Sequence, residues 1–96
     1  MNAVEVAERV TSVVVYYDPV HNDWVAVVRT DQGMKLVGRK NGTSESALAS
    51  AIMGLLAQTN SGLGIERQTA EEAARILQDV SKVSVANVSE RGERCG

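Results

Sequence analysis

Hydrophobic positions in the first forty residues fall into three short runs separated by turn residues. Residues 12–17, 24–29 and 34–39 are rich in β-branched and aromatic side chains, a composition typical of strands. Asp18-Pro19 ends the first run, because proline lacks an N–H, and Gly33 supplies a tight turn before the third. Such short connections between consecutive strands favour an antiparallel meander.

The chain then changes to a helical period. Thr43 or Ser44 is placed to cap a helix that runs to about Gln58. Thr69 starts the next helix, where Thr69 and Glu72 have the spacing of a capping box. This second helix is amphipathic, and its apolar stripe consists of Ala70, Ala73, Ile76, Leu77 and Val80.

Both ends of the chain have weaker patterns. Residues 2–9 fit either a helix capped by Asn2 or an alternating strand, and we favour the helix. A last short strand is indicated by three valines, Val83, Val85 and Val88. The pattern predicts one α+β domain over residues 1–88, followed by a flexible polar tail over residues 89–96. In this domain two or three helices pack against a small antiparallel sheet of three or four strands.

The first two strands are apolar on both sides. In the first, Val13, Val15 and Tyr17 alternate with Val14 and Tyr16, and the second strand follows the same pattern. In a sheet with one solvent-exposed face, each strand should instead alternate apolar with polar residues. We therefore expect both faces to be covered, one by a helix and the other by the C-terminal helix or by a second chain.

The helix over residues 44–58 has Glu45 as its single charged residue. A helix that is apolar nearly all round should be buried nearly all round. One of its faces is a row of small side chains, which lets another helix approach closely. That other helix is either residues 70–82 of the same chain or part of a second copy, and the second alternative predicts a homodimer. The predicted contact residues are Ser46, Ala49, Ser50, Met53 and Gly54.

Composition limits the classes of function. The 96 residues are 44% hydrophobic and 23% charged, as in ordinary globular domains, and ten basic against twelve acidic residues give a net charge of −2. This charge excludes a bulk polycation that coats nucleic acid. No apolar run reaches the roughly 18 residues that cross a bilayer, and the charged first ten residues do not resemble a signal peptide. We therefore expect a cytoplasmic protein in which the single Cys95 makes no intrachain disulfide.

The sequence predicts no catalytic, metal or cofactor site. His21 is the only histidine, so one chain cannot build a multi-histidine metal site. Asp18, Asp23, Asp31 and Glu45 are acids that could in principle act together, but turn chemistry and a helix start account for each of them. We therefore expect a protein that is not an enzyme.

One local charge asymmetry indicates where a partner binds. Residues 1–28 hold one arginine against four acids, a net charge of −3, whereas residues 29–40 hold four cations against Asp31, a net charge of +3. The predicted partner-binding cations are Arg29, Lys35, Arg39 and Lys40. Their partner would be an acidic protein surface or a nucleoprotein complex, and direct contact with phosphate is an alternative. A third interpretation is a charged edge strand that discourages aggregation.

The order of three strands and a helix that opens Gly42-Thr-Ser-Glu-Ser-Ala-Leu-Ala resembles several known families. Over about residues 2–58 it resembles the double-stranded RNA-binding domain, although Glu45 lies where that domain has a lysine cluster for phosphate. The layout is similar to antitoxins with a truncated ribonuclease-H-like fold. The segment 34–39 with the alanine-rich helix resembles small phage-encoded anti-CRISPR inhibitors.

The last resemblance implies a non-catalytic protein that blocks a bacterial defence complex by surface contact. We therefore expect a small intracellular binding protein of this kind, acting in the host cytoplasm if a phage encodes it. The alternative is a nucleic-acid-binding module, antitoxin or transcriptional regulator that uses the basic third strand.

Overall fold

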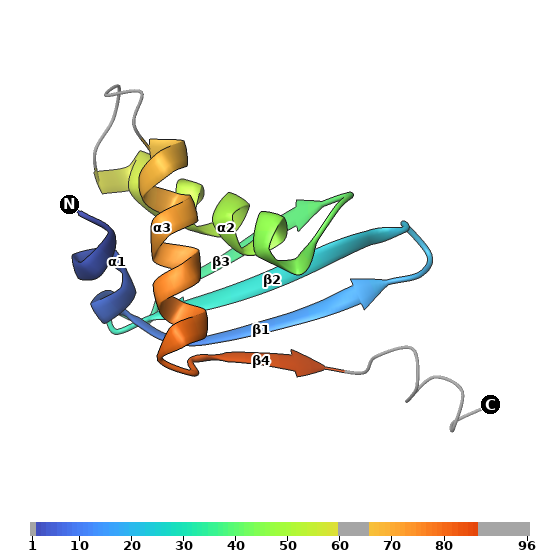
Figure 1. Cartoon of the computed structure of the whole chain (residues 1–96), viewed down its shortest axis with the longest axis horizontal. Coiled ribbons are helices and arrows are strands. Elements are labelled where there is room, and N and C mark those ends of the chain that lie inside the picture. Colours follow the sequence, from blue (N-terminus) through green and yellow to red (C-terminus); the bar gives the residue numbers. More distant parts are fainter. Residues whose placement is uncertain (1, 60–65, 87–96) are drawn as a thin grey trace.

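The computed structural model describes residues 2–59 and 66–86. It confirms an α+β fold with three helices and a four-stranded sheet in this part of the chain (Figure 1). The elements in chain order are α1 (Ala3–Arg9), β1 (Val10–Asp18), β2 (Asp23–Thr30), β3 (Lys35–Lys40), α2 (Ser44–Thr59), α3 (Glu66–Asp79) and β4 (Val83–Ala86).

The strand order is β3-β2-β1-β4. Strands β1, β2 and β3 form the predicted antiparallel meander. The sheet is nevertheless mixed, because β4 pairs parallel to β1, with Val13 opposite Val83 and Val15 opposite Val85. The expectation of a purely antiparallel sheet was wrong at this strand. The helical connection returns the chain to the end of the sheet where β1 begins, which is how parallel neighbours are joined.

The local signals for two helix starts are confirmed. The Asn2 side chain accepts from the Glu5 amide at 2.9 Å and the Glu5 carboxylate accepts from the Asn2 amide at 3.0 Å, so residues 2–9 begin as a capped helix. The Thr43 hydroxyl accepts from the Ser46 amide at 3.1 Å and caps α2. Helix α3, in contrast, begins at Glu66, and Thr69 lies inside it. The prediction for Thr69 was wrong because Thr and Glu three residues apart also occur within helices.

The hydrophobic core lies between α2, α3 and one face of the sheet. Leu48, Ile52 and Leu56 of α2 are fully buried, and Leu77 of α3 is buried beside them. Helix α2 packs closely against β3 at Gly38, where a Cβ atom would lie 2.5 Å from the Ala51 amide nitrogen. The sheet on one side and α3 on another therefore account for most of the burial of α2 within one chain.

The second face of the sheet is not covered by the C-terminal helix. Helices α2 and α3 lie over the same face, and α1 packs against α3 (Figure 1). The alternative in which α3 covers the opposite face was wrong, because α3 packs its apolar side on α2 and α1 instead. Within the described residues, nothing packs on the other face.

The C-terminal boundary is only partly described. The predicted last strand is present as β4, whereas Val88, the domain limit at residue 88 and the tail over residues 89–96 lie outside the described residues. No helix in the described part of the chain is long and apolar enough to span a bilayer.

Candidate protein-binding surface

The face of the sheet that points away from the helices is the candidate binding surface, and we call it the open face. Its side chains are those that alternate with the buried positions Val13, Val15 and Val28 along each strand. From β1 to β3 the open face consists of Ser12, Val14, Tyr16, Asp18, Asp23, Val25, Val27, Arg29, Lys35, Val37 and Arg39.

The centre of the open face is apolar. Val14 is 39% exposed and Val37 is 56% exposed, and Val27 between them is half-buried. Val25 is only 1% exposed, because its cross-strand neighbours Tyr16 and Arg39 have long side chains that shield it. A sheet face that remained in water would carry polar residues at these positions. The centre of the open face is therefore an apolar patch that no described element of the chain covers.

One end of the open face carries two available cations. Arg29 and Lys35 are register partners on β2 and β3, and both are exposed. Within the described residues, neither side chain forms an ion pair with a carboxylate. The two positive charges at this end are therefore free to meet an acidic group of a partner.

The other end of the open face holds a closed ion-pair cluster. Arg39 Nη1 lies 3.0 Å from Asp23 Oδ1 and 3.2 Å from Asp18 Oδ2. His21 Nδ1 lies 2.8 Å from the same Asp18 oxygen. Because two carboxylates surround the Arg39 guanidinium, its charge is already balanced within the chain.

The cluster also shifts the titration of its members. The hydrogen bond from the His21 ring is the main reason that the pKa of Asp18 falls from 3.8 to about 2, and amide donors and Arg39 lower this pKa further against the effect of desolvation. The carboxylates of Asp18 and then Asp23 raise the pKa of Arg39 above its ordinary value. Asp18 and Arg39 therefore stay charged at neutral pH.

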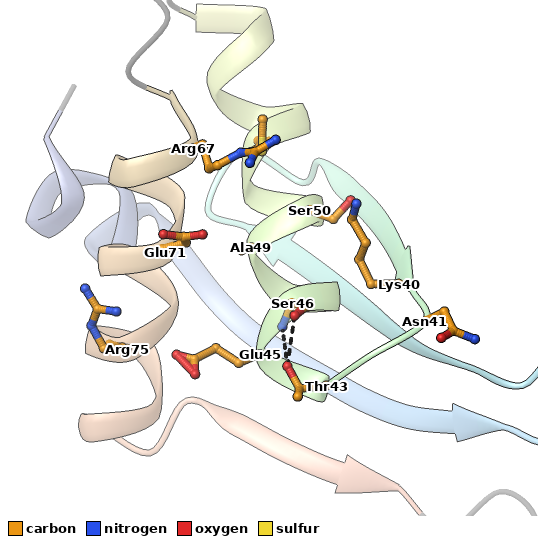
Figure 2. A pocket seen from close by; sticks show the side chains of 11 residues that line it. Lys40, Asn41, Thr43, Glu45, Ser46, Ala49, Ser50, Arg67, Glu71 and Arg75 are labelled. Atoms are coloured by element: carbon orange, nitrogen blue, oxygen red, sulfur yellow. Dashed lines mark hydrogen bonds between the residues drawn. The ribbon is translucent and has the colours of Figure 1, made fainter.

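The fourth predicted cation lies on the opposite side of the sheet. Lys35 and Arg39 share one side of β3, whereas Lys40 points to the helix side and lines a groove of about 450 Å³. Figure 2 shows Lys40 pointing toward Ser50 of α2, with Arg67 and Arg75 on α3 across the groove. The structure thus divides the basic segment between two surfaces.

The same groove contains four of the five predicted dimer-contact residues of α2. Ser46, Ala49, Ser50 and Met53 line it, with Ala49 buried and Ser46 exposed. Gly54 instead lies against β3, where a Cβ atom would be 3.4 Å from Leu36 Cδ2. The homodimer contact on this row stays a prediction, although the groove contains Glu45 and Glu71 as well as the three cations and is less apolar than the row alone suggests.

The apolar character of β1 and β2 on both sides was the sequence signal for the open face, but the sequence did not show which side the helices would leave uncovered.

Among the described residues no group of three or more His, Cys, Asp or Glu side chains is placed to hold a metal ion. Comparisons with family models, with curated proteins and with solved structures find no match to this chain.

Proposed function

We propose that this chain is a non-enzymatic binding protein that docks a partner protein on the open face of its sheet. Val14, Val27 and Val37 make the apolar contact, and Arg29 with Lys35 meets acidic groups of the partner. The observation that carries this proposal is that the open face has an apolar centre while every described helix lies on the opposite face of the sheet.

The layout of the open face suits a protein partner. An apolar centre with charged groups at its ends has the arrangement of protein–protein interfaces, in which a dry core is surrounded by a polar rim. The basic end, with Arg29 and Lys35, would orient a partner that carries acidic groups and would disfavour one that carries cations there. Affinity then comes mainly from the valines, and orientation comes mainly from the charges.

The charge layout also favours protein over nucleic acid as the partner. Arg39 is balanced by Asp18 and Asp23, and Lys40 points to the other side of the sheet. Among the described residues of the open face, Arg29 and Lys35 are the only cations without a carboxylate partner, and contact with a phosphate backbone usually involves more than two cations. Within this proposal, the partner is a component of a bacterial defence complex, as the resemblance to anti-CRISPR inhibitors implies.

The test compares two substitutions of equally exposed valines. Val37→Asp changes the open face, whereas Val4→Asp on α1 makes the same change at a site with 55% exposure against 56% for Val37. Partners captured from a bacterial lysate by the wild type are identified, purified and titrated against both variants and against Arg29→Glu/Lys35→Glu. We expect the affinity to fall at least about tenfold for Val37→Asp and for the charge reversal, and to be unchanged for Val4→Asp.

Two results would overturn the proposal. One is a purified partner that binds Val37→Asp and the charge-reversed variant as tightly as the wild type. The other is metal-dependent cleavage of RNA or DNA by the pure protein, because that would make the chain an enzyme. A steep loss of affinity with added salt, in a complex with nucleic acid alone, would favour the alternative function instead.

A further inference from the structure

The two edges of the sheet are protected very differently. Strand β3 carries Lys35, Arg39 and Lys40 among its six residues, and such charges discourage another strand from pairing. Strand β4 (Val-Ser-Val-Ala) has no charged residue and no proline. Its Val85 side chain is 67% exposed, and in the described part of the chain no strand pairs with its outer side. The β4 edge is therefore open to strand addition.

The backbone of β4 presents its free polar groups in a regular pattern. The Val13 amide donates to the Lys82 carbonyl oxygen at 3.1 Å, and Val13 lies opposite Val83 in the parallel register. In a parallel ladder, every second residue of a strand forms backbone hydrogen bonds with a given neighbouring strand. Ser84 therefore directs its N–H and C=O toward β1. Val83 and Val85 consequently direct their N–H and C=O groups outward, where no strand of the described residues pairs with them.

The nearest cation is held away from this edge. Lys82 Nζ donates to the Val10 carbonyl oxygen at 2.9 Å and to the Ala7 carbonyl oxygen at 3.1 Å. Both acceptors belong to the junction of α1 and β1, on the inner side of β4. Lys82 therefore places no charge at the β4 edge, whereas the cations of β3 discourage strand pairing at the β3 edge.

We propose that β4 pairs antiparallel with β4 of a second copy of this chain, about a two-fold axis at Ser84. In this register Val83 of each copy faces Val85 of the other, and the outward N–H and C=O groups of both residues are paired. The exposed Val85 side chain gains an apolar neighbour on the helix side of the sheet. A small hollow of about 180 Å³ lined by Val15, Leu48, Val83 and Val85 lies beside the same edge.

A second copy fits this edge because the strand is self-complementary. The two-fold register uses every outward group of Val83 and Val85 and opposes no like charges. Pairing through β3 would instead bring Lys35, Arg39 and Lys40 of the two copies together, so the assembly closes as a dimer and does not extend into a fibre. If the proposed function holds, the dimer also sets two open faces on the same side of one continuous sheet, which gives bivalent binding.

Covalent trapping tests the register. At the two-fold axis Ser84 faces its own counterpart in a pair without hydrogen bonds, where Cα atoms are about 4.5 Å apart and a disulfide can form. In the full chain carrying Cys95→Ser, the Ser84→Cys variant should form a disulfide-linked dimer readily when oxidised glutathione is added to accept the two electrons. Val20→Cys, at the β1–β2 turn where Val20 is 85% exposed, is the control for random collision and should cross-link much less.

Sedimentation of the full chain over a range of concentrations tests the dimer itself. Val85→Pro removes an outward N–H and leaves the hydrogen bonds between β4 and β1 intact. Val85→Lys, which places a charge on the edge, is the second variant to use if the proline variant fails to fold. Both should weaken dimerisation at least about tenfold, whereas Ser50→Arg in the α2 groove should leave it unchanged. A wild type that stays monomeric at millimolar concentration, or dimers lost in Ser50→Arg but kept in the Val85 variants, would overturn the proposal. So would equal cross-linking of Ser84→Cys and Val20→Cys.

Discussion

Replacing Gly38 with alanine is the sharpest test of how α2 packs on the sheet. The added Cβ would lie 2.5 Å from the Ala51 amide nitrogen and 3.0 Å from Ala51 Cα, and it would also overlap the Ala47 carbonyl oxygen. All three are backbone atoms of α2, so no rotation of a side chain relieves the clash. The helix must move away from β3 to make room.

The loss in the free energy of unfolding follows from the packing between α2 and β3 that this movement disrupts. Inserting one carbon into a packed core costs about 1–3 kcal/mol, and a rigid backbone neighbour places this site at the upper end. Alanine also restricts the unfolded chain, which returns about 0.4–1 kcal/mol. We therefore expect a net destabilisation of about 2–3 kcal/mol. For a domain of this size each kcal/mol shifts the melting temperature by about 4–8 °C, so the midpoint should fall by about 10–20 °C.

Gly54→Ala is the matched control. The same methyl group there would lie 3.4 Å from Leu36 Cδ2, the end of a flexible side chain, and alanine favours a helix interior over glycine by up to about 1 kcal/mol. Urea denaturation followed by circular dichroism should show the two variants moving in opposite directions. If Gly38→Ala is as stable as the wild type, the close approach of α2 to β3 is wrong.

Two further predictions follow from the polar contacts. Because the pKa of Asp18 in the folded protein is about 2, below its ordinary 3.8, this group stabilises the fold above about pH 4, and that contribution is lost as the pH falls toward 2. Asp18→Asn should therefore lower stability at pH 7 and flatten its decrease between pH 4 and pH 2 in acid unfolding; an unchanged profile would contradict this. Lys82→Met removes the donor to the Val10 and Ala7 carbonyl oxygens and should cost about 1–3 kcal/mol in thermal unfolding, whereas a stability equal to wild type would show that these bonds contribute nothing.

Local structure was largely determined by the sequence. The β-branched runs produced β1, β2 and β3, and the capping residues Asn2 and Thr43 marked the starts of α1 and α2. These signals are short-range, because strand composition and cap hydrogen bonds depend on residues a few positions apart. The apolar pattern on both sides of β1 and β2 likewise indicated a sheet with a second face to cover.

Only the tertiary structure decided which face of the sheet stays uncovered and which side chains come together on it. Whether α3 would pack on the second face or on α2 depends on long-range contacts, and its preference for α2 and α1 is what leaves Val14 and Val37 bare. The path of the chain from α2 through α3 placed β4 parallel to β1 at the edge of the sheet. The uncharged strand Val83–Ala86 thereby became an edge strand. Four cations close in sequence were divided because strand alternation turns Lys40 away from Arg39, and because Asp18 and Asp23, distant in the chain, reach Arg39 across the sheet.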